Sequence, residues 1–197
     1  MIDSQARSGR RTELVTAAYR VIAERGFEGL RTREVAGAAG VNIATLHYYF
    51  PSKEDLIKGV VGYAMSRFQT TLTSDGTAIQ RLRAHIQGLR RLSREEPELF
   101  GVMGELMMRS ARDPALGRIV AKTNEFWHGT LKEMLRAARA DEDLPAAIEP
   151  DGMAAVIVAT LKGVYLVPGN TGANEDLEKA LRQLERLLGL TAKRVHT

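Results

Sequence analysis

Apolar residues recur at spacings of three and four along the chain, and the alternation typical of strands is absent. The clearest stripe predicts a first helix over about residues 12–25; it consists of Leu14, Ala18, Val21 and Ile22, and Gly26 follows as a left-handed C-cap. With 44% hydrophobic residues, the chain holds enough apolar side chains for a packed core. We therefore expect an all-α fold.

Proline, glycine and Asp–Gly steps divide the rest of the chain into further helices. Two short helices are expected over about residues 32–39, with Thr32 as the N-cap, and about 42–49. Six longer helices are expected at about 53–72, 76–95, 97–111, 114–139, 151–167 and 174–189, which makes about nine helices in all. The predicted organisation is a three-helix N-terminal domain over 1–52 and a larger helical bundle over 53–197.

Residues 30–50, with the sequence L-R-T-R-E-V-A-G-A-A-G-V-N-I-A-T-L-H-Y-Y-F, read as two short helices joined by a tight turn. Ala36 is small enough for close helix approach, and Gly40 takes the turn at no steric cost. Val41 and Leu46 are expected to pack inward. The residues expected to point outward are Asn42, Ile43, Ala44, Thr45, Tyr48 and Tyr49. A short helix that begins with small and polar residues suits the major groove of DNA.

Together with P-S-K-E-D-L at residues 51–56, this segment resembles the signature of the tetracycline-repressor (TetR) family, over about residues 10–56. The resemblance implies a helix-turn-helix that binds double-stranded operator DNA. It implies phosphate contacts by Thr32, Thr45, His47, Tyr49 and Lys53. It also implies a base or phosphate contact by Arg33 and base-edge contacts by Ile43, Ala44 and Tyr48, with Asn42 at the start of the same helix. His47 stands where the family prefers Tyr, and Tyr49 where it often has His.

Two features of this region have more than one interpretation. Arg7, Arg10 and Arg11 form a basic N-terminal arm that either touches DNA or is a solvated, disordered terminus. The helical hairpin itself has an alternative without DNA, in which Tyr48 and Tyr49 are core aromatics. In that case the chain is a helical ligand-binding or carrier protein that keeps the hairpin only for its structure.

The last two helices carry the pattern expected of a pairing surface. Helix-turn-helix proteins usually bind DNA as symmetric dimers, so two copies must pair. Helix 174–189 has a leucine stripe, and helix 151–167 is apolar nearly all round. The predicted dimer-interface residues are Ile157, Leu161, Leu177, Leu181, Leu184 and Leu188. The same stripe is also compatible with a core inside one chain.

The middle helices are rich in Met and aromatic residues, which suits an adaptable apolar pocket for a small-molecule effector. The predicted pocket residues are Phe100, Met103, Met107, Trp127 and Tyr165. An ordinary core would have the same composition.

Composition excludes several classes of protein. There is no cysteine, so disulfide scaffolds and thiolate metal sites are excluded, and the four histidines are too scattered for a metal site. No nucleophile–base constellation or phosphate-cradling loop is present, so we expect neither an enzyme nor a cofactor. No segment has the length and hydropathy of a membrane span or a secretory signal, which favours the cytoplasm. The net charge of +4 favours a polyanionic partner only weakly.

We expect a dimeric repressor of a pseudo-palindromic operator, released by a small apolar effector.

Overall fold

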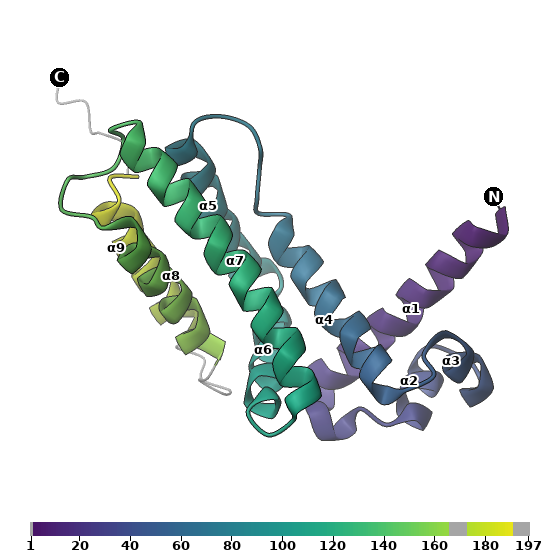
Figure 1. Ribbon diagram of the computed structural model, residues 1–197. Helices are drawn as coiled ribbons and strands as arrows, with labels where there is room; N and C mark the ends of the chain where they lie inside the picture. The colour runs from purple at the N-terminus through teal and green to yellow at the C-terminus, as the bar shows by residue number, and fades with distance from the viewer. Residues whose placement is uncertain (1, 166–172, 191–197) are drawn as a thin grey trace. The chain divides into compact units, whose positions relative to one another are not determined.

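The computed structural model describes the backbone of residues 2–165 and 173–190, and the side chains of residues 7–163 and 175–190. These residues form nine α-helices and one 3-10 turn, without a strand (Figure 1). The elements are α1 (Ile2–Arg25), η1 (Phe27–Gly29), α2 (Thr32–Ala38), α3 (Ile43–Tyr49), α4 (Lys53–Gln69), α5 (Ala78–Glu95), α6 (Pro97–Ser110), α7 (Pro114–Ala140), α8 (Pro150–Tyr165) and α9 (Ala173–Leu187). The predicted all-α class is confirmed.

The helices gather into two compact units, and each is described by itself. The first unit contains the described residues of Met1–Arg67 and Glu98–Lys122, and the second those of Phe68–Pro97 and Thr123–Thr197. Helix α7 contributes to both units. The sequence predicts a functional boundary between residues 52 and 53. The two units described here are defined by packing and not by function, so that boundary stays a prediction.

The core of the first unit is built around α1. Leu14, Ala18 and Ile22 are at most 1% exposed, and Val35 of α2 is fully buried. The helix ends at the predicted glycine: Gly26 has a φ of 67°, and its N–H donates to the Ile22 carbonyl over 2.9 Å, although its ψ of −179° is outside the left-handed helical region. The predicted start at about residue 12 is wrong, because α1 begins at Ile2. The described side chains of its first turns, residues 7–11, are all exposed, and apolar periodicity detects only buried faces.

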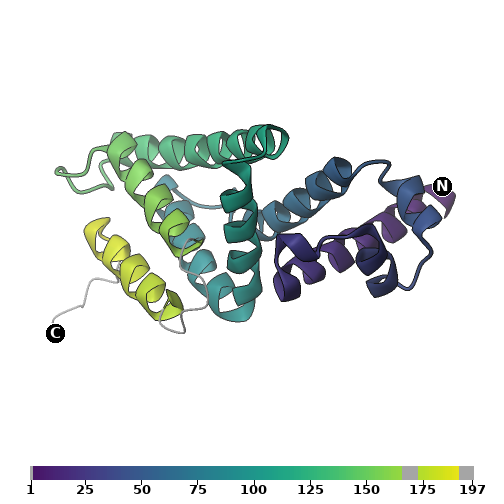
Figure 2. The ribbon, with the colours of Figure 1, turned by 90° about the horizontal axis from the view of Figure 1, so that it is seen from below.

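The second unit consists of α5, the second half of α7, α8 and α9. Helix α9 lies beside α5 and α8 (Figures 1 and 2). Helix α5 starts with a reciprocal cap: the Thr77 hydroxyl accepts from the Gln80 backbone N–H, and the Gln80 side chain accepts from the Thr77 N–H. The helix therefore begins after Thr77, two residues later than the predicted start at 76.

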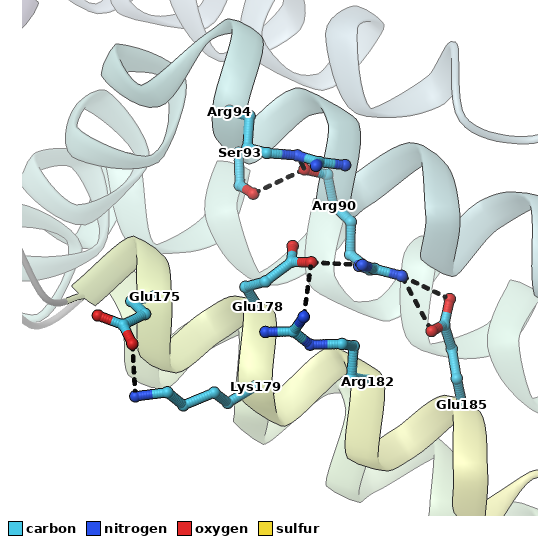
Figure 3. A network of polar contacts seen from close by, with 8 residues as sticks. All are labelled: Arg90, Ser93, Arg94, Glu175, Glu178, Lys179, Arg182 and Glu185. Carbon is cyan, nitrogen blue, oxygen red and sulfur yellow. Dashed lines mark hydrogen bonds and ion pairs between the residues drawn. The ribbon is translucent and has the colours of Figure 1, made fainter.

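An ion-pair network joins α5 to α9 on one side of this core (Figure 3). The Arg90 guanidinium donates to the carboxylates of Glu178 and Glu185, and its Nη1 lies 3.0 Å from Glu185 Oε2. The hydrogen bond from Arg90 lowers the pKa of the Glu178 carboxyl. The Glu185 side chain is 9% exposed, so this pair is largely shielded from solvent.

A buried histidine forms a second polar contact inside the same unit. His85 is 1% exposed, and Trp127 Nε1–H donates to its Nε2 over 3.0 Å. Its Nδ1 lies 2.7 Å from Thr71 Oγ1, and that hydroxyl lies 2.6 Å from the Phe68 carbonyl, to which it donates. Every proton has a place if His85 is neutral and carries its hydrogen on Nδ1. Burial lowers the pKa of His85 from 6.5 to about 4.

Candidate nucleic-acid interface

Helices α2 and α3 are joined by a short turn whose geometry depends on glycine. Gly40 has a φ of 64°, and the Val41 N–H donates to the Ala36 carbonyl over 2.9 Å. This is the Schellman-type end that a left-handed residue after a helix permits. The turn brings α3 directly after α2 and leaves its first residue, Ile43, 37% exposed.

Asn42 sets the start of α3. Its side-chain oxygen accepts the Thr45 backbone N–H at 2.7 Å and the Thr45 hydroxyl at 2.9 Å. Such an N-cap satisfies one of the free N–H groups of the helix start. The Thr45 hydroxyl has a single proton, which it donates to Asn42. A hydrogen bond from Thr45 to a phosphate therefore requires that hydroxyl to rotate away from Asn42.

The two sides of α3 differ sharply in exposure. Leu46 and the following Phe50 are each 2% exposed and hold the helix against the core. Tyr48 is 62% exposed, which is unusual for so large a side chain in water. Of the predicted DNA contacts, Arg33, Asn42, Ile43, Ala44, His47, Tyr48 and Lys53 are exposed, and Thr32, Thr45 and Tyr49 are partly buried.

The predicted N-cap of α2 is wrong by one residue. Thr32 is the first residue of the helix, and Arg31, with an extended backbone, occupies the cap position without a side-chain hydrogen bond. Leu30, just before the helix, is 2% exposed, and its burial fixes the path of the chain out of η1. Arg31 therefore takes the N-cap position of α2, although a hydroxyl side chain such as that of Thr32 is preferred there.

Helix α4 begins at the same surface. Ser52 caps it, because its hydroxyl oxygen accepts the Asp55 N–H at 3.0 Å. The Ser52 hydroxyl also donates to the Asp55 carboxylate and lowers the pKa of that carboxyl. Lys53, the first residue of α4, has its Nζ 5.0 Å from the centre of the Phe27 ring.

The first turns of α1 carry the basic residues whose position relative to α3 the sequence left open. The Arg7 guanidinium lies 5.2 Å from the centre of the Tyr48 ring, and that of Arg11 lies 4.8 Å from the Phe50 ring. Arg10 pairs with Glu13 at 2.6 Å. The helical form of this arm thus brings one guanidinium onto the most exposed aromatic residue of α3. The spacing of the three arginines was the only signal of this in the sequence.

Comparison with known proteins agrees with this geometry. The N-terminal profile of bacterial regulatory proteins of the tetR family matches residues 14–60, and the C-terminal profile of BetI-type transcriptional repressors matches residues 78–192. The second match covers more than half of the chain. The chain belongs to the TetR family.

Two curated TetR-family relatives share part of the sequence. The transcriptional repressor KstR2 of Rhodococcus jostii is 39% identical over 59 residues, which are 30% of this chain and 29% of the relative. The repressor KstR of Mycobacterium tuberculosis is 30% identical over 106 residues, or 52% of this chain and 48% of the relative. The chain therefore spans less than half the length of these curated relatives.

Solved structures of TetR regulators share the fold. A regulator from Haloarcula marismortui has a TM-score of 0.78 and 21% identity, with 93% of this chain and 98% of that chain covered. AibR, in complex with isovaleryl coenzyme A and operator DNA, has a TM-score of 0.67 and 21% identity, with 91% and 98% covered. These likenesses show that the TetR fold extends over nearly the whole chain.

The six residues predicted for the dimer interface belong to the core of one chain. Ile157, Leu161, Leu177, Leu181, Leu184 and Leu188 are each at most 4% exposed. A stripe at helical spacing marks a buried face, but it does not tell whether the covering surface is in the same chain. Among the described residues, the exposed apolar side chains of α8 and α9 include Val156 and Leu187.

The residues predicted for the effector pocket are distributed over both units. Phe100 and Met103 of α6 are buried, and Met107 of the same helix is partly buried. Trp127 lies in the second unit, partly buried, with its indole N–H on His85. Tyr165 is outside the residues whose side chains are described. The pocket stays a prediction.

In the described part of the chain, no group of three or more His, Cys, Asp or Glu residues is arranged to hold a metal ion. No helix there combines the length and hydropathy needed to cross a membrane.

Proposed function

We propose that the chain is a DNA-binding transcriptional repressor that acts as a homodimer on a pseudo-palindromic operator. The observation that carries the proposal is the two-sided character of α3. Leu46 and Phe50 fix the helix in the core, while Ile43 and Tyr48 extend into solvent beside a basic arm. A fixed helix with an exposed, capped N-terminal end is the arrangement by which helix-turn-helix proteins present side chains to the major groove.

The proposed contacts divide into those that position the protein and those that read sequence. Thr32, Thr45, His47, Tyr49 and Lys53 bind phosphates, and Arg33 binds a phosphate or a base. Asn42, Ile43, Ala44 and Tyr48 face the base edges. Phosphate contacts set the register of the helix, and base contacts give the sequence preference. We add Arg7 to the first group, because its guanidinium lies over the Tyr48 ring.

The proposed pairing surface is the exposed side of α8 with the neighbouring end of α9. Ala155, Val156, Ala159 and Gly163 are exposed at spacings of three and four, so they share one face of α8. Val156 and, on α9, Leu187 are each 47% exposed, and both are apolar. Small residues allow close helix approach, and burial of the two larger side chains stabilises the dimer. The second chain then supplies the second half-site contact, about 34–36 Å along the DNA.

The proposed control is release by a small apolar effector. The pocket residues proposed from the sequence remain Phe100, Met103, Met107, Trp127 and Tyr165. Such a ligand releases DNA only if it binds the DNA-incompetent state more tightly. This role requires no catalysis and no cofactor, and operator DNA places the protein in the cytoplasm.

Selection of double-stranded DNA from a random library, with the purified full chain at physiological salt, tests the proposal. A pseudo-palindromic sequence should be enriched. Fluorescence anisotropy on that DNA then compares Lys53→Ala with Lys58→Ala. Lys58 is a matched control one turn along α4, because it already pairs with Glu54 at 3.0 Å.

Loss of one phosphate contact per chain lowers the slope of log affinity against log salt by about two for a dimer. K53A should show this decrease, and K58A should keep the wild-type slope. Failure to enrich any sequence, or identical slopes for the two variants, would contradict the proposal. Circular dichroism spectra of both variants serve as the control that the helical fold is retained.

A further inference from the structure

A hollow of about 240 Å³ lies within the first unit, close to the proposed DNA surface. Its walls come from η1, the first turns of α4, the end of α6 and the start of α7. Phe27, Ile57, Leu116 and Ile119 supply an apolar lining. Pockets for drug-sized ligands begin at roughly 300 Å³, so this hollow suits a smaller molecule.

Two cations stand at the same apolar wall. The Lys53 Nζ lies 5.0 Å from the centre of the Phe27 ring, and the Arg109 guanidinium carbon lies 5.2 Å from it. Arg109 Nη1 also lies 3.3 Å from Glu28 Oε1, and the Glu28 side chain is 89% exposed. Within the part of the chain that the structure describes, no carboxylate pairs with Lys53. An exposed ion pair such as Arg109–Glu28 is weak and exchanges readily with another anion.

The acidic residues at the hollow already have partners. The Glu54 carboxylate lies 3.0 Å from the Lys58 ammonium. Asp113 caps α7, because its Oδ1 accepts the N–H groups of Ala115 and Leu116 at 3.0 and 3.1 Å. Lys53 is therefore the charge at this hollow that lacks a counter-charge.

The lining is held in place before any ligand arrives. The Glu105 carboxylate of α6 accepts the Phe27 backbone N–H at 3.1 Å, which fixes η1 against α6. Phe27 itself is 4% exposed. A preformed apolar wall lowers the ordering cost of binding.

We propose that this hollow binds a small amphipathic anion, with its apolar part against Phe27, Ile57 and Leu116 and its negative group at Lys53 and Arg109. The proposal rests on the proposed function at one point: Lys53 is also the phosphate contact at the start of α4. The anion and an operator phosphate then compete for the same ammonium group. The hollow is an anion-responsive site that acts directly on the DNA surface.

Isothermal titration of the full chain with octanoate, octan-1-ol and octylammonium tests the ligand chemistry. The three probes share an alkyl chain and differ in charge. Octanoate should bind at least tenfold more tightly than octan-1-ol, and octylammonium should bind most weakly. Equal affinities of octanoate and octan-1-ol would overturn the proposal, because the cations would then have no role.

Three variants locate the site. Arg109→Met removes one cation and keeps an unbranched apolar stem, and Ala115→Phe fills the hollow from the start of α7. Each should weaken octanoate binding at least tenfold. Arg112→Met removes an exposed arginine three residues further along and should bind octanoate as the wild type does. Octanoate binding that survives both R109M and A115F would place the ligand elsewhere and overturn the proposal.

Operator binding measured with and without octanoate distinguishes this inference from the proposed function. Octanoate should weaken binding of the selected operator by the wild type, and R109M should need at least tenfold more octanoate for the same effect. If the operator binds and octanoate leaves its affinity unchanged, the competition at Lys53 is refuted while the repressor function stands. If no DNA is selected at all, the proposed function fails, and the titrations still decide whether the hollow takes an anion.

Discussion

His85 should make the second unit sensitive to acid, and the substitution His85→Gln tests this. The imidazole is 1% exposed and neutral, accepting from Trp127 at Nε2 and donating from Nδ1 to Thr71. Protonation of Nε2 removes the acceptor for the indole N–H and places a charge in an apolar core. Glutamine offers Trp127 an acceptor at a similar reach and does not titrate between pH 4 and pH 7.

The magnitude follows from the lowered pKa. In the unfolded chain the imidazole binds a proton near its ordinary pKa of 6.5, and in the folded chain burial lowers this pKa to about 4. Between these values the unfolded state holds more protons, so the free energy of unfolding decreases as the pH falls. Each pH unit costs about 1.4 kcal/mol, so His85 removes about 3 kcal/mol between pH 6.5 and pH 4.

Urea unfolding at half-unit steps from pH 7.5 to pH 4.5 measures this effect. Trp127 is the single tryptophan of the chain and contacts His85 directly, so its fluorescence reports on the relevant unit. The difference in unfolding free energy between wild type and H85Q should shift in favour of the variant as the pH falls through 6.5. His47→Gln, on the exposed side of α3, controls for loss of a histidine. Parallel curves for wild type and H85Q would refute the reasoning.

Three further predictions concern the DNA surface, the pairing surface and the charge network. Arg7→Ala should weaken operator binding about tenfold by anisotropy, whereas Arg10→Ala, whose guanidinium pairs with Glu13, should have little effect. Val156→Glu should convert dimers to monomers in light scattering, because it places two like charges in the proposed interface. Arg90→Met should cost about 3 kcal/mol in urea unfolding, because two carboxylates on α9 lose their cation. Arg91→Met, on the exposed side of α5, should be nearly neutral.

The helices themselves could be predicted well, because each buries a stripe of apolar residues that the sequence displays. Most predicted ends fall within three residues of the observed ones, and Gly26 and Ser52 act as the cap residues that their types suggest. The exception is the start of α1. Among the described residues of its first turns, 7–11, no side chain is buried, and their role becomes visible only where Arg7 meets Tyr48.

The helix-turn-helix surface was predictable for a different reason. Its residues follow a fixed local order, so the tight turn at Gly40 determines which side chains of α3 point outward. The bundle has no such local rule. The stripe of Leu177, Leu181, Leu184 and Leu188 has the same spacing whether it covers its own core or a partner. Only the exposed fraction, at most 4% for each of these residues within one chain, distinguishes the two.

The His85 site was missed because its partners are distant in sequence. Thr71 and Trp127 lie 14 and 42 residues away, and no periodic pattern links a helix end, a buried histidine and an indole. The same holds for Arg90, which meets Glu178 and Glu185 only after α9 packs on α5. Long-range polar contacts of this kind depend on tertiary packing, whereas hydropathy patterns report only the apolar face.

Lys53 links the two proposals, and thermodynamics then fixes a relation between them. If octanoate at both sites lowers the operator affinity of the dimer by a given factor, operator DNA must lower the product of the two octanoate affinities by the same factor. A hundredfold change on both sides corresponds to about 2.7 kcal/mol, or one tenfold step for each of two Lys53 contacts. Titrating octanoate into the preformed operator complex, and into the free dimer, measures the second factor independently. Equal octanoate affinity in both titrations would mean that octanoate and operator are not coupled, and would remove Lys53 from one of the two sites.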